Sequence, residues 1–534
     1  MRTWLLLTDC YCCMPKTLSY VKVSLIDYLF FIFAMEMLNN RYINLVWALW
    51  LCTGICQAQY HLTFESSKDG SILLTKDIQH AIDSLHENGG GELIFPKGKY
   101  LTGSIVLKEN VAIKLKKGAV LLGSTNPDDY KSLNRWQALI LADGQNNISI
   151  QGEGMINGRG RQLALYIDSL FYLGKVDSAD YNFIEKRPKY TIRPQIIEFV
   201  NCRKVVIQDI TIKNAACWVQ TYDRCNQLII DNVTVDSDAY WNNDGIDIID
   251  SKDVLIQNCK INSSDDGICL KSSIENSKIG DHSCENIRIK DCNVRSSASA
   301  IKLGSRSVGG FRNISIENVK IKDTYRSAIA LESVDGGLMQ NIVVKNIRAK
   351  NVGNAFFIRL GQRYRKSPTK SRIEGILIEN MKVKIAQDRP DKKYQIIGPE
   401  LPFFHNPFPA SITGINGQSA REITLRNILI SHPGNAVKGY ANFPLEHLEK
   451  IPELPRAYPE FSMFAELPAW GIYIRHVADL ELKNVTLKLR NKDFRKAIVL
   501  DDVSNARFYN LKFPGYKLSD PIYQNASQEI YIDN

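Results

Sequence analysis

The chain has 534 residues, of which 67 are lysine or arginine and 57 are aspartate or glutamate, giving a formal net charge of +10. A basic surplus of this kind suits an anionic polymer as a partner. The sequence contains no helix-turn-helix, zinc-finger or interleaved aromatic and basic motif. We therefore do not expect a nucleic-acid partner.

The first 58 residues differ from the rest of the chain. Residues 37–58 combine a basic residue, Arg41, with an apolar core and a small residue, Ala58, which predicts a secretory signal and a mature start at Gln59. Cys56 suggests a lipoprotein, but the three residues before it fit a lipid-attachment site poorly. We expect an exported protein, periplasmic or extracellular, that is monomeric and leaves the membrane once the signal is removed.

Residues 1–36 carry a second, shorter apolar run from Tyr28 to Met35. We interpret this segment as a start site placed too far upstream, with translation beginning at Met37. A membrane anchor is the alternative, but this run is too short to span a bilayer.

A helix is predicted at the start of the mature chain. Ile78, Ala81, Ile82 and Leu85 lie at helical spacing. Short strands separated by glycine turns follow, at 111–115, 119–122 and 148–160 among others. The helix would cover the open end of a stacked β-structure, which otherwise exposes unpaired strand edges.

The middle of the chain repeats one strand pattern. Residues 244–248 and 266–270 share the order acid, glycine, apolar, small or polar, apolar at an offset of 22 residues, and 300–304, 328–332 and 356–360 are related. Repetition at this length without a helical period predicts an all-β parallel solenoid. Two apolar columns should face inward: Ile246, Ile268, Ile301, Ile329 and Phe356, and Ile248, Leu270, Leu303, Leu331 and Ile358.

Two further columns should face outward. The members of the first are Asp244, Asp266, Ser299, Ser327 and Asn354, and those of the second are Lys271, Gly304, Glu332 and Arg359. Asp244, Asp265 and Asp266 should therefore meet on one face of adjacent coils. Close carboxylates raise the pKa of at least one member, which supplies the proton donor and the ionised carboxylate that glycoside hydrolysis needs. The alternative is that these aspartates have a structural role, because aspartates are common at solenoid turns, where their side chains bond to backbone groups.

Three stretches interrupt the repeat, at about 161–195, 361–412 and 431–469. Each is rich in proline, aromatic and basic residues, and long loops on a rigid scaffold often carry binding residues. We expect them to wall a cleft.

Seven cysteines follow residue 58, at 202, 217, 225, 259, 269, 284 and 292. An odd number argues against a complete disulfide framework. Cys259 and Cys292 occupy equivalent repeat positions and should stack as small buried residues.

From about residue 70 to 515 the chain resembles glycoside hydrolase family 28, the polygalacturonases and their relatives, and in particular its bacterial branch. Asn242-Asn243-Asp244 matches the family's Asn-x-Asp signature, and Asp265-Asp266 before Gly267 matches its paired aspartates. The resemblance implies a right-handed parallel β-helix over residues 59–534, inverting cleavage of galacturonic-acid-containing pectic chains, and no metal or other cofactor. Asp265 would be the general acid, Asp244 and Asp266 would activate the attacking water, and Asn242 would bind the substrate.

Two family signatures are missing. Ala298-Ser299-Ala300 stands where the family has Gly-His-Gly, and the Arg-Ile-Lys triplet that binds the substrate carboxylate is absent. Outward basic residues could replace it, namely Lys271, Lys302, Arg306, Arg326 and Arg359. We expect Lys302 and Arg359 to do so; otherwise these residues are solvated or pair with Glu332.

These departures leave the substrate open between plain polygalacturonan, a rhamnose-containing pectic backbone and a short acidic oligosaccharide. Loops that close the cleft would favour exo-action. Two alternatives use the same fold. One is a polysaccharide lyase, in which the aspartates would bind calcium; the other is a non-catalytic protein that binds acidic glycans.

Overall fold

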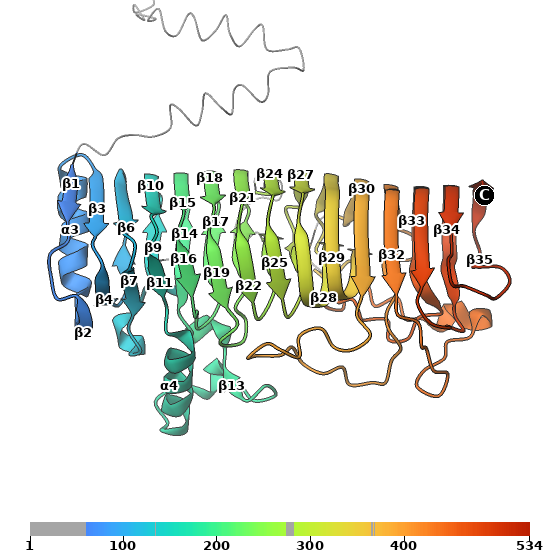
Figure 1. Cartoon of the computed structure of the whole chain (residues 1–534), viewed down its shortest axis with the longest axis horizontal. Coiled ribbons are helices and arrows are strands. Elements are labelled where there is room, and N and C mark those ends of the chain that lie inside the picture. The colour runs from blue at the N-terminus through green and yellow to red at the C-terminus, as the bar shows by residue number, and fades with distance from the viewer. Residues whose placement is uncertain (1–59, 134, 274–281, 365–366, 368, 534) are drawn as a thin grey trace, which may run out of the picture. The chain divides into compact units, whose positions relative to one another are not determined.

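The computed structural model describes residues 60–133, 135–273, 282–364, 367 and 369–533. They form a right-handed parallel β-helix whose coils follow one another in chain order (Figure 1). The predicted signal at 37–58 and the segment 1–36 lie outside the described residues. Within the described part of the chain, no helix is long and apolar enough to cross a membrane.

Each coil contributes one strand to each of three stacks. The first stack contains β5 (Ile105–Val106), β9 (Gln137–Asp143), β14 (Gln195–Val200), β17 (Gln220–Asp223), β20 (Ile246–Ile249), β23 (Ile268–Ser272), β26 (Ile301–Ser307), β31 (Ala410–Thr413) and β35 (Ile522–Asn525). The second contains β1 (His61–Thr63), β3 (Gly91–Phe95), β6 (Val111–Leu115), β10 (Asn146–Gln151), β15 (Arg203–Gln208), β18 (Asn226–Asp231), β21 (Lys252–Gln257), β24 (Cys284–Lys290), β27 (Phe311–Glu317) and β36 (Gln528–Asp533).

The third stack contains β2 (Asp69–Leu73), β4 (Gly98–Thr102), β7 (Ala119–Gly123), β11 (Met155–Asn157), β16 (Thr211–Lys213), β19 (Thr234–Ser237), β22 (Lys260–Ser263) and β25 (Asn293–Ser296). Later strands run without a break from one stack into the next: β28 (Lys320–Ser333), β29 (Leu338–Leu360), β30 (Arg372–Ile385), β32 (Ala420–His432), β33 (Ala469–Leu489) and β34 (Lys496–Lys512). The short β8 (Lys131–Ser132) pairs antiparallel with β9.

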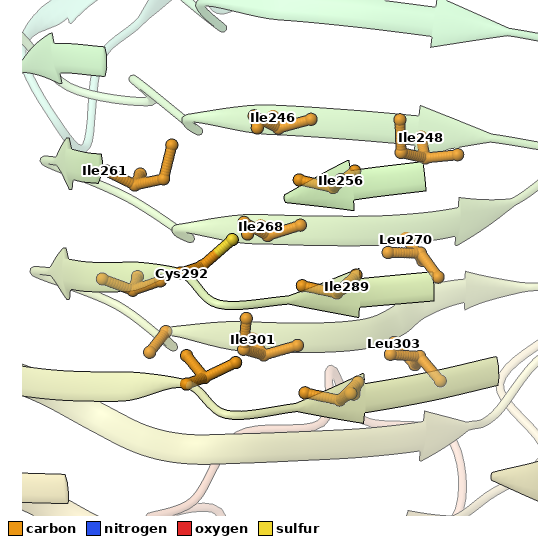
Figure 2. Packing of buried hydrophobic residues seen from close by; sticks show 14 of the residues in the cluster. Ile246, Ile248, Ile256, Ile261, Ile268, Leu270, Ile289, Cys292, Ile301 and Leu303 are labelled. Carbon is orange, nitrogen blue, oxygen red and sulfur yellow. The ribbon is translucent and has the colours of Figure 1, made fainter. Parts of the chain in front are cut away.

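The strand register confirms both predicted inward columns. Ile246, Ile268, Ile301, Ile329 and Phe356 are successive register partners, as are Ile248, Leu270, Leu303, Leu331 and Ile358. All ten side chains are fully buried, and Figure 2 shows three members of each column one above another. Stacked isoleucine and leucine side chains therefore fill the interior and fix the register, because a slip by one residue would turn each column outward.

Part of each outward column is present. Ser327 opposes Asn354 and Glu332 opposes Arg359. Lys271 opposes Ile249 on the preceding coil, and towards the following coil the register between β23 and β26 shifts between Leu270 and Ser272.

Asparagines hold one line of turns in place. These residues have positive φ angles near 55°, and each donates its side-chain amide to the asparagine one coil earlier: Asn346, Asn380, Asn427, Asn484 and Asn510. Asparagine tolerates this left-handed conformation better than most residues. The ladder satisfies polar groups that stacked turns would otherwise leave unpaired.

Helix α3 (Thr75–Glu87) lies at the first coil, where the capping helix was predicted (Figure 1). Its buried residues are Ile78, Ile82 and Leu85.

Two of the predicted loop stretches contain regular structure that was missed. The first holds helix α4 (Gly160–Tyr172), whose buried face includes Leu163, Ala164 and Ile167 at helical spacing, the hairpin of β12 (Tyr181–Asn182) and β13 (Arg187–Pro188), and the 3₁₀ helices η2 (Ser178–Asp180) and η3 (Tyr190–Ile192). The second includes β30, a strand of an ordinary coil. Between β32 and β33, residues 433–468 form a long connection with one 3₁₀ helix, η4 (Leu445–Lys450); the remaining 3₁₀ helix is η1 (Pro127–Asp129).

The seven cysteines after residue 58 are all free and buried. Cys259 and Cys292 are both fully buried, as predicted.

Candidate active site

Two Asp-Gly steps bring the aspartates together. Asp244 and Asp266 come two residues before β20 and β23, and the Gly245 N–H donates to the Asp266 carbonyl at 2.9 Å. A Cβ atom on Gly245 would lie 2.5 Å from the Gly267 carbonyl oxygen, and one on Gly267 would lie 2.5 Å from that of Ala300. Glycine is therefore needed after each aspartate so that successive coils can approach this closely.

Asp244, Asp265 and Asp266 form one cluster. One carboxylate oxygen from each lies within 4.8 Å of the other two. Asp244 and Asp266 are each only 4% exposed, and Asp265 is partly buried. The coil offset predicted this meeting, and the geometry shows it.

A fourth aspartate, Asp247, belongs to the same cluster and was not predicted. Lys271 Nζ lies 3.1 Å from Asp244 Oδ2, contacts Asp247 Oδ1 and sits 4.4 Å from the centre of the Trp218 ring. The sequence held a signal for it, since Asp247 stands between the inward residues Ile246 and Ile248 and must face outward.

Lys302 is the second cation inside the cluster. Its Nζ lies 3.1 Å from Asp266 Oδ2 and 3.9 Å from Glu332 Oε2, and it donates to Tyr458 Oη at 3.1 Å. Lys302 is 2% exposed. Lys271 and Lys302 therefore balance the carboxylates of the protein itself.

The electrostatic surroundings separate the two adjacent aspartates. Burial and the neighbouring Asp266 raise the pKa of Asp265. Burial alone would raise the pKa of Asp266 too, but Lys302, Lys271 and Arg326 outweigh it and hold that pKa below its ordinary value. Asp265 therefore holds its proton to a higher pH than the adjacent Asp266 does.

The other acids of the cluster also hold protons more tightly than usual. Burial raises the pKa of Asp244 well above its ordinary value despite Lys271. It raises that of Asp247 to about 6 and that of Glu332 to about 7. These groups titrate as a set rather than one by one.

Asn242 links the cluster to a buried arginine. Its Nδ2 lies 3.4 Å from Asp265 Oδ2, and its Oδ1 accepts from Arg193 Nη2 at 2.6 Å. Arg193 is 1% exposed and also donates to the carbonyls of Ala216 and Trp241. No sequence pattern indicated Arg193, which comes from the non-repeating stretch 161–195.

The remaining predicted cations lie in different surroundings. Arg326 Nε lies 3.3 Å from Glu460 Oε1, and its charge acts on Asp265 and Asp266. Arg306, on β26, has a buried Nη1 with no hydrogen-bond partner among the described residues. Arg359 is 1% exposed, and its guanidinium donates to the carbonyls of Gly414, Glu453 and Leu454. These bonds tie Arg359 to the connection 433–468, and its role toward substrate stays a prediction.

Ser299 occupies the position where a histidine was expected. Its backbone N–H donates to Asp266 Oδ1 at 3.0 Å. The backbone thus supports the ionised aspartate directly.

A family model for the glycosyl hydrolases family 28 matches residues 89–396 of this chain. The chain belongs to glycosyl hydrolase family 28. The matched region contains the whole aspartate cluster with Lys271, Lys302 and Arg326, whereas Tyr458 and Glu460 lie beyond it.

Named relatives are similar over part of their length. A "Probable polygalacturonase" from Vitis vinifera is 27% identical over 313 residues, covering 54% of this chain and 60% of the relative. An "Exo-poly-alpha-D-galacturonosidase" from Dickeya chrysanthemi is 25% identical over 325 residues, covering 53% of this chain and 54% of the relative. The match thus spans little more than half the length of these family 28 relatives.

Two solved structures share the fold. An exopolygalacturonase from Yersinia enterocolitica has a TM-score of 0.57 at 17% identity, covering 89% of this chain and 78% of that one. An exopolygalacturonase from Thermotoga maritima has a TM-score of 0.54 at 22% identity, covering 70% of this chain and 88% of that one.

Proposed function

We propose that this family 28 protein is a glycoside hydrolase of the polygalacturonase type that removes units from one end of galacturonic-acid-containing pectic chains. In this proposal Asp265 is the general acid and Asp266 the general base, with Asp244 helping to hold the attacking water. The observation that carries it is geometric: one carboxylate oxygen from each aspartate lies within 4.8 Å of the other two, and Lys302 Nζ lies 3.1 Å from Asp266 Oδ2. These surroundings go with a contrast between the two adjacent carboxyl groups, since the pKa of Asp265 is raised and that of Asp266 is lowered.

This contrast supplies both halves of the chemistry. A carboxyl with a raised pKa is suited to protonate the leaving oxygen, and a carboxylate with a lowered pKa is suited to take a proton from water. Asp244 has a raised pKa, so it suits a hydrogen bond to the water better than the role of base. Asn242, bonded to both Asp265 and Arg193, suits the task of orienting the acid.

The carboxyl spacing bears on the stereochemistry. The resemblance to the family implies inversion, but carboxyl groups of inverting enzymes usually stand about 6.5–9.5 Å apart and those of retaining enzymes about 5–5.5 Å. The nearest oxygens here lie within 4.8 Å. We propose inversion, with the water held at the edge of the cluster between Asp244 and Asp266. The anomer that is released first distinguishes inversion from retention.

A pectic substrate is supported by the names of the relatives and by the positive charge of the chain. Lys271 and Lys302 are paired with protein carboxylates, and Arg326 is paired with Glu460. Arg306 keeps a buried Nη1 without a hydrogen-bond partner in the described part of the chain. We therefore propose that Arg306 binds the substrate carboxylate, and that Lys271 and Lys302 act through the aspartates.

Exo-action is supported by the connection 433–468. Tyr458 and Glu460 from this connection contact Lys302 and Arg326, which lie at the acid cluster. A wall at this place would stop a polymer from passing through the cleft, so a chain end would be bound instead.

The lysines bear on the lyase alternative. A lysine that acts as the base of a β-elimination must be neutral before it takes a proton, whereas the carboxylates around Lys271 and Lys302 outweigh burial and raise the pKa of both well above the ordinary value. Both lysines would be poor bases. Absorbance of unsaturated uronate products, with and without a chelator, would detect a lyase directly.

The test is release of reducing sugar by residues 59–534 from polygalacturonan, rhamnogalacturonan and their oligosaccharides. Asp265→Asn should lose about 10²–10⁴-fold in rate. Asp209→Asn, an exposed turn aspartate, is the matched control and should retain the parent rate. Equal rates for the parent and Asp265→Asn, or binding without release, would overturn the proposal in favour of a non-catalytic glycan-binding protein.

A further inference from the structure

One segment of the connection 433–468, residues 453–460, follows a row of outward side chains. Arg475, Thr413, Arg359 and Glu332 are register partners on successive coils. Register partners in parallel strands lie about 4.8 Å apart, so this row leads from β33 back to the acid cluster. We call residues 453–460 the strap.

The strap is fixed at its first residues. The Glu453 carboxylate lies 3.1 Å from Arg475 Nη2 and 2.7 Å from His476 Nε2, and accepts from the Asn416 N–H at 3.1 Å. Burial alone would lower the pKa of His476, but its bonds to Glu453 and Asp502 raise it. The imidazole therefore keeps its proton to a higher pH than an ordinary histidine, and in that charged form it holds Glu453.

The backbone next to Glu453 is held as well. Arg359 donates to the carbonyls of Glu453 and Leu454, and the Gln362 N–H donates to the Pro455 carbonyl at 2.7 Å. Leu454 has a φ of 46°. Leucine rarely adopts this left-handed conformation, which persists only where the surroundings determine it.

The other end of the strap contacts the acid cluster. Tyr458 Oη accepts from Lys302 Nζ at 3.1 Å, and the same Nζ lies 3.1 Å from Asp266 Oδ2. Glu460 pairs with Arg326 at 3.3 Å. Tyr458 is 51% exposed, so its ring borders solvent while its hydroxyl fixes a buried lysine.

We propose that the strap is a positioning device: Glu453 anchors it, and Tyr458 holds Lys302 against Asp266 so that Asp266 stays ionised for its role as base. This inference rests on the proposed function of Asp266. Tyr458 is thus a positioning residue and acts through Lys302. The strap lies outside the residues 89–396 that the family model matches.

Tyr458→Phe removes only the hydroxyl that Lys302 contacts. We expect kcat to fall about 10–150-fold, the effect of losing one hydrogen bond to a charged group, while KM changes little because the ring remains. The acidic limb of the pH profile of kcat/KM should move to higher pH. Lys302 will offset the negative charge of Asp266 less well, so the pKa of Asp266 will rise. Tyr440→Phe, in the same connection and 61% exposed, is the matched control.

Glu453→Gln tests the anchor at a distance from the chemistry. The change keeps the side-chain shape but removes the charge that Arg475 and His476 hold. We expect the same direction of change in kcat and in the acidic limb, and faster amide hydrogen exchange at residues 453–460. Glu449→Gln, exposed in the same connection, should behave like the parent.

The outcomes separate this inference from the proposed function. A parent-like acidic limb and kcat for Tyr458→Phe, or parent-like exchange of the strap for Glu453→Gln, would overturn the positioning role. If the parent releases no sugar, the proposed function fails, and amide hydrogen exchange then tests the positioning role of the strap by itself. Tyr458→Phe must still speed exchange at residues 453–460 and in β26. Unchanged exchange in this variant would overturn the positioning role.

Discussion

Replacing Glu198 by glutamine should stabilise the protein at alkaline pH. Glu198 lies on β14 and is 1% exposed. Burial is the largest cause that raises its pKa from 4.5 to about 7, although Arg135 opposes the rise. An ionised Glu198 is therefore a cost to the folded state.

The size and sign of this effect follow from the pKa. Below about pH 4.5 the side chain is protonated in both the folded and the unfolded chain, and it contributes no difference. As the pH rises to about 7, only the unfolded chain loses the proton, so the free energy of unfolding falls by about 1.4 kcal/mol per pH unit. Above pH 7 the loss levels off at about 3 kcal/mol, which Glu198→Gln should recover.

Thermal unfolding between pH 4 and pH 9 measures this difference. At about 2 cal/mol/K of unfolding entropy per residue, 3 kcal/mol corresponds to a rise in Tm of about 3 °C at pH 8 for a chain of this length, with no difference at pH 4. Glu446→Gln, at an exposed site, is the control and should show no pH-dependent difference. A gain that is equal at every pH, or a loss at pH 8, would refute the reasoning.

Glu198→Gln should also leave the active site working. Glu198, Thr221 and Asp247 are register partners, so Glu198 lies two coils, about 10 Å, from the cluster. Activity close to that of the parent would separate this stability effect from catalysis.

Three further predictions concern the reaction. Asp265→Asn should lose about 10²–10⁴-fold in rate on the natural linkage but little on an aryl galacturonide, whose leaving group needs no proton. Asp266→Asn should lose activity on both substrates. Equal losses on both substrates for Asp265→Asn would contradict the acid assignment. Proton NMR of the first product from an α-linked substrate should show the β-anomer, and an initial α-anomer would establish retention. Arg306→Met should raise KM for galacturonan oligosaccharides but not for their methyl esters, and an equal rise for both would exclude Arg306 as the carboxylate ligand.

The sequence by itself determined the coils and the aspartates. In a parallel solenoid an offset along the chain becomes a stacking distance in space, so the repeat fixed the inward columns from Ile246 to Phe356 and placed Asp244 beside Asp265 and Asp266. The same alternation would have revealed Asp247. Predicting these positions requires only the strand register between neighbouring coils, which the stacking of buried apolar side chains specifies strongly.

The tertiary structure decided which partner each charged group has. Lys302 was a candidate for binding substrate, but it is bonded to Asp266 and to Tyr458, which lies 156 residues further along the chain. Arg359 faces outward as predicted, yet the connection 433–468 covers it. Arg193 reaches Asn242 from a stretch without any repeat. No periodic pattern relates such residues, because connections that leave the coils return to positions set by packing rather than by the repeat.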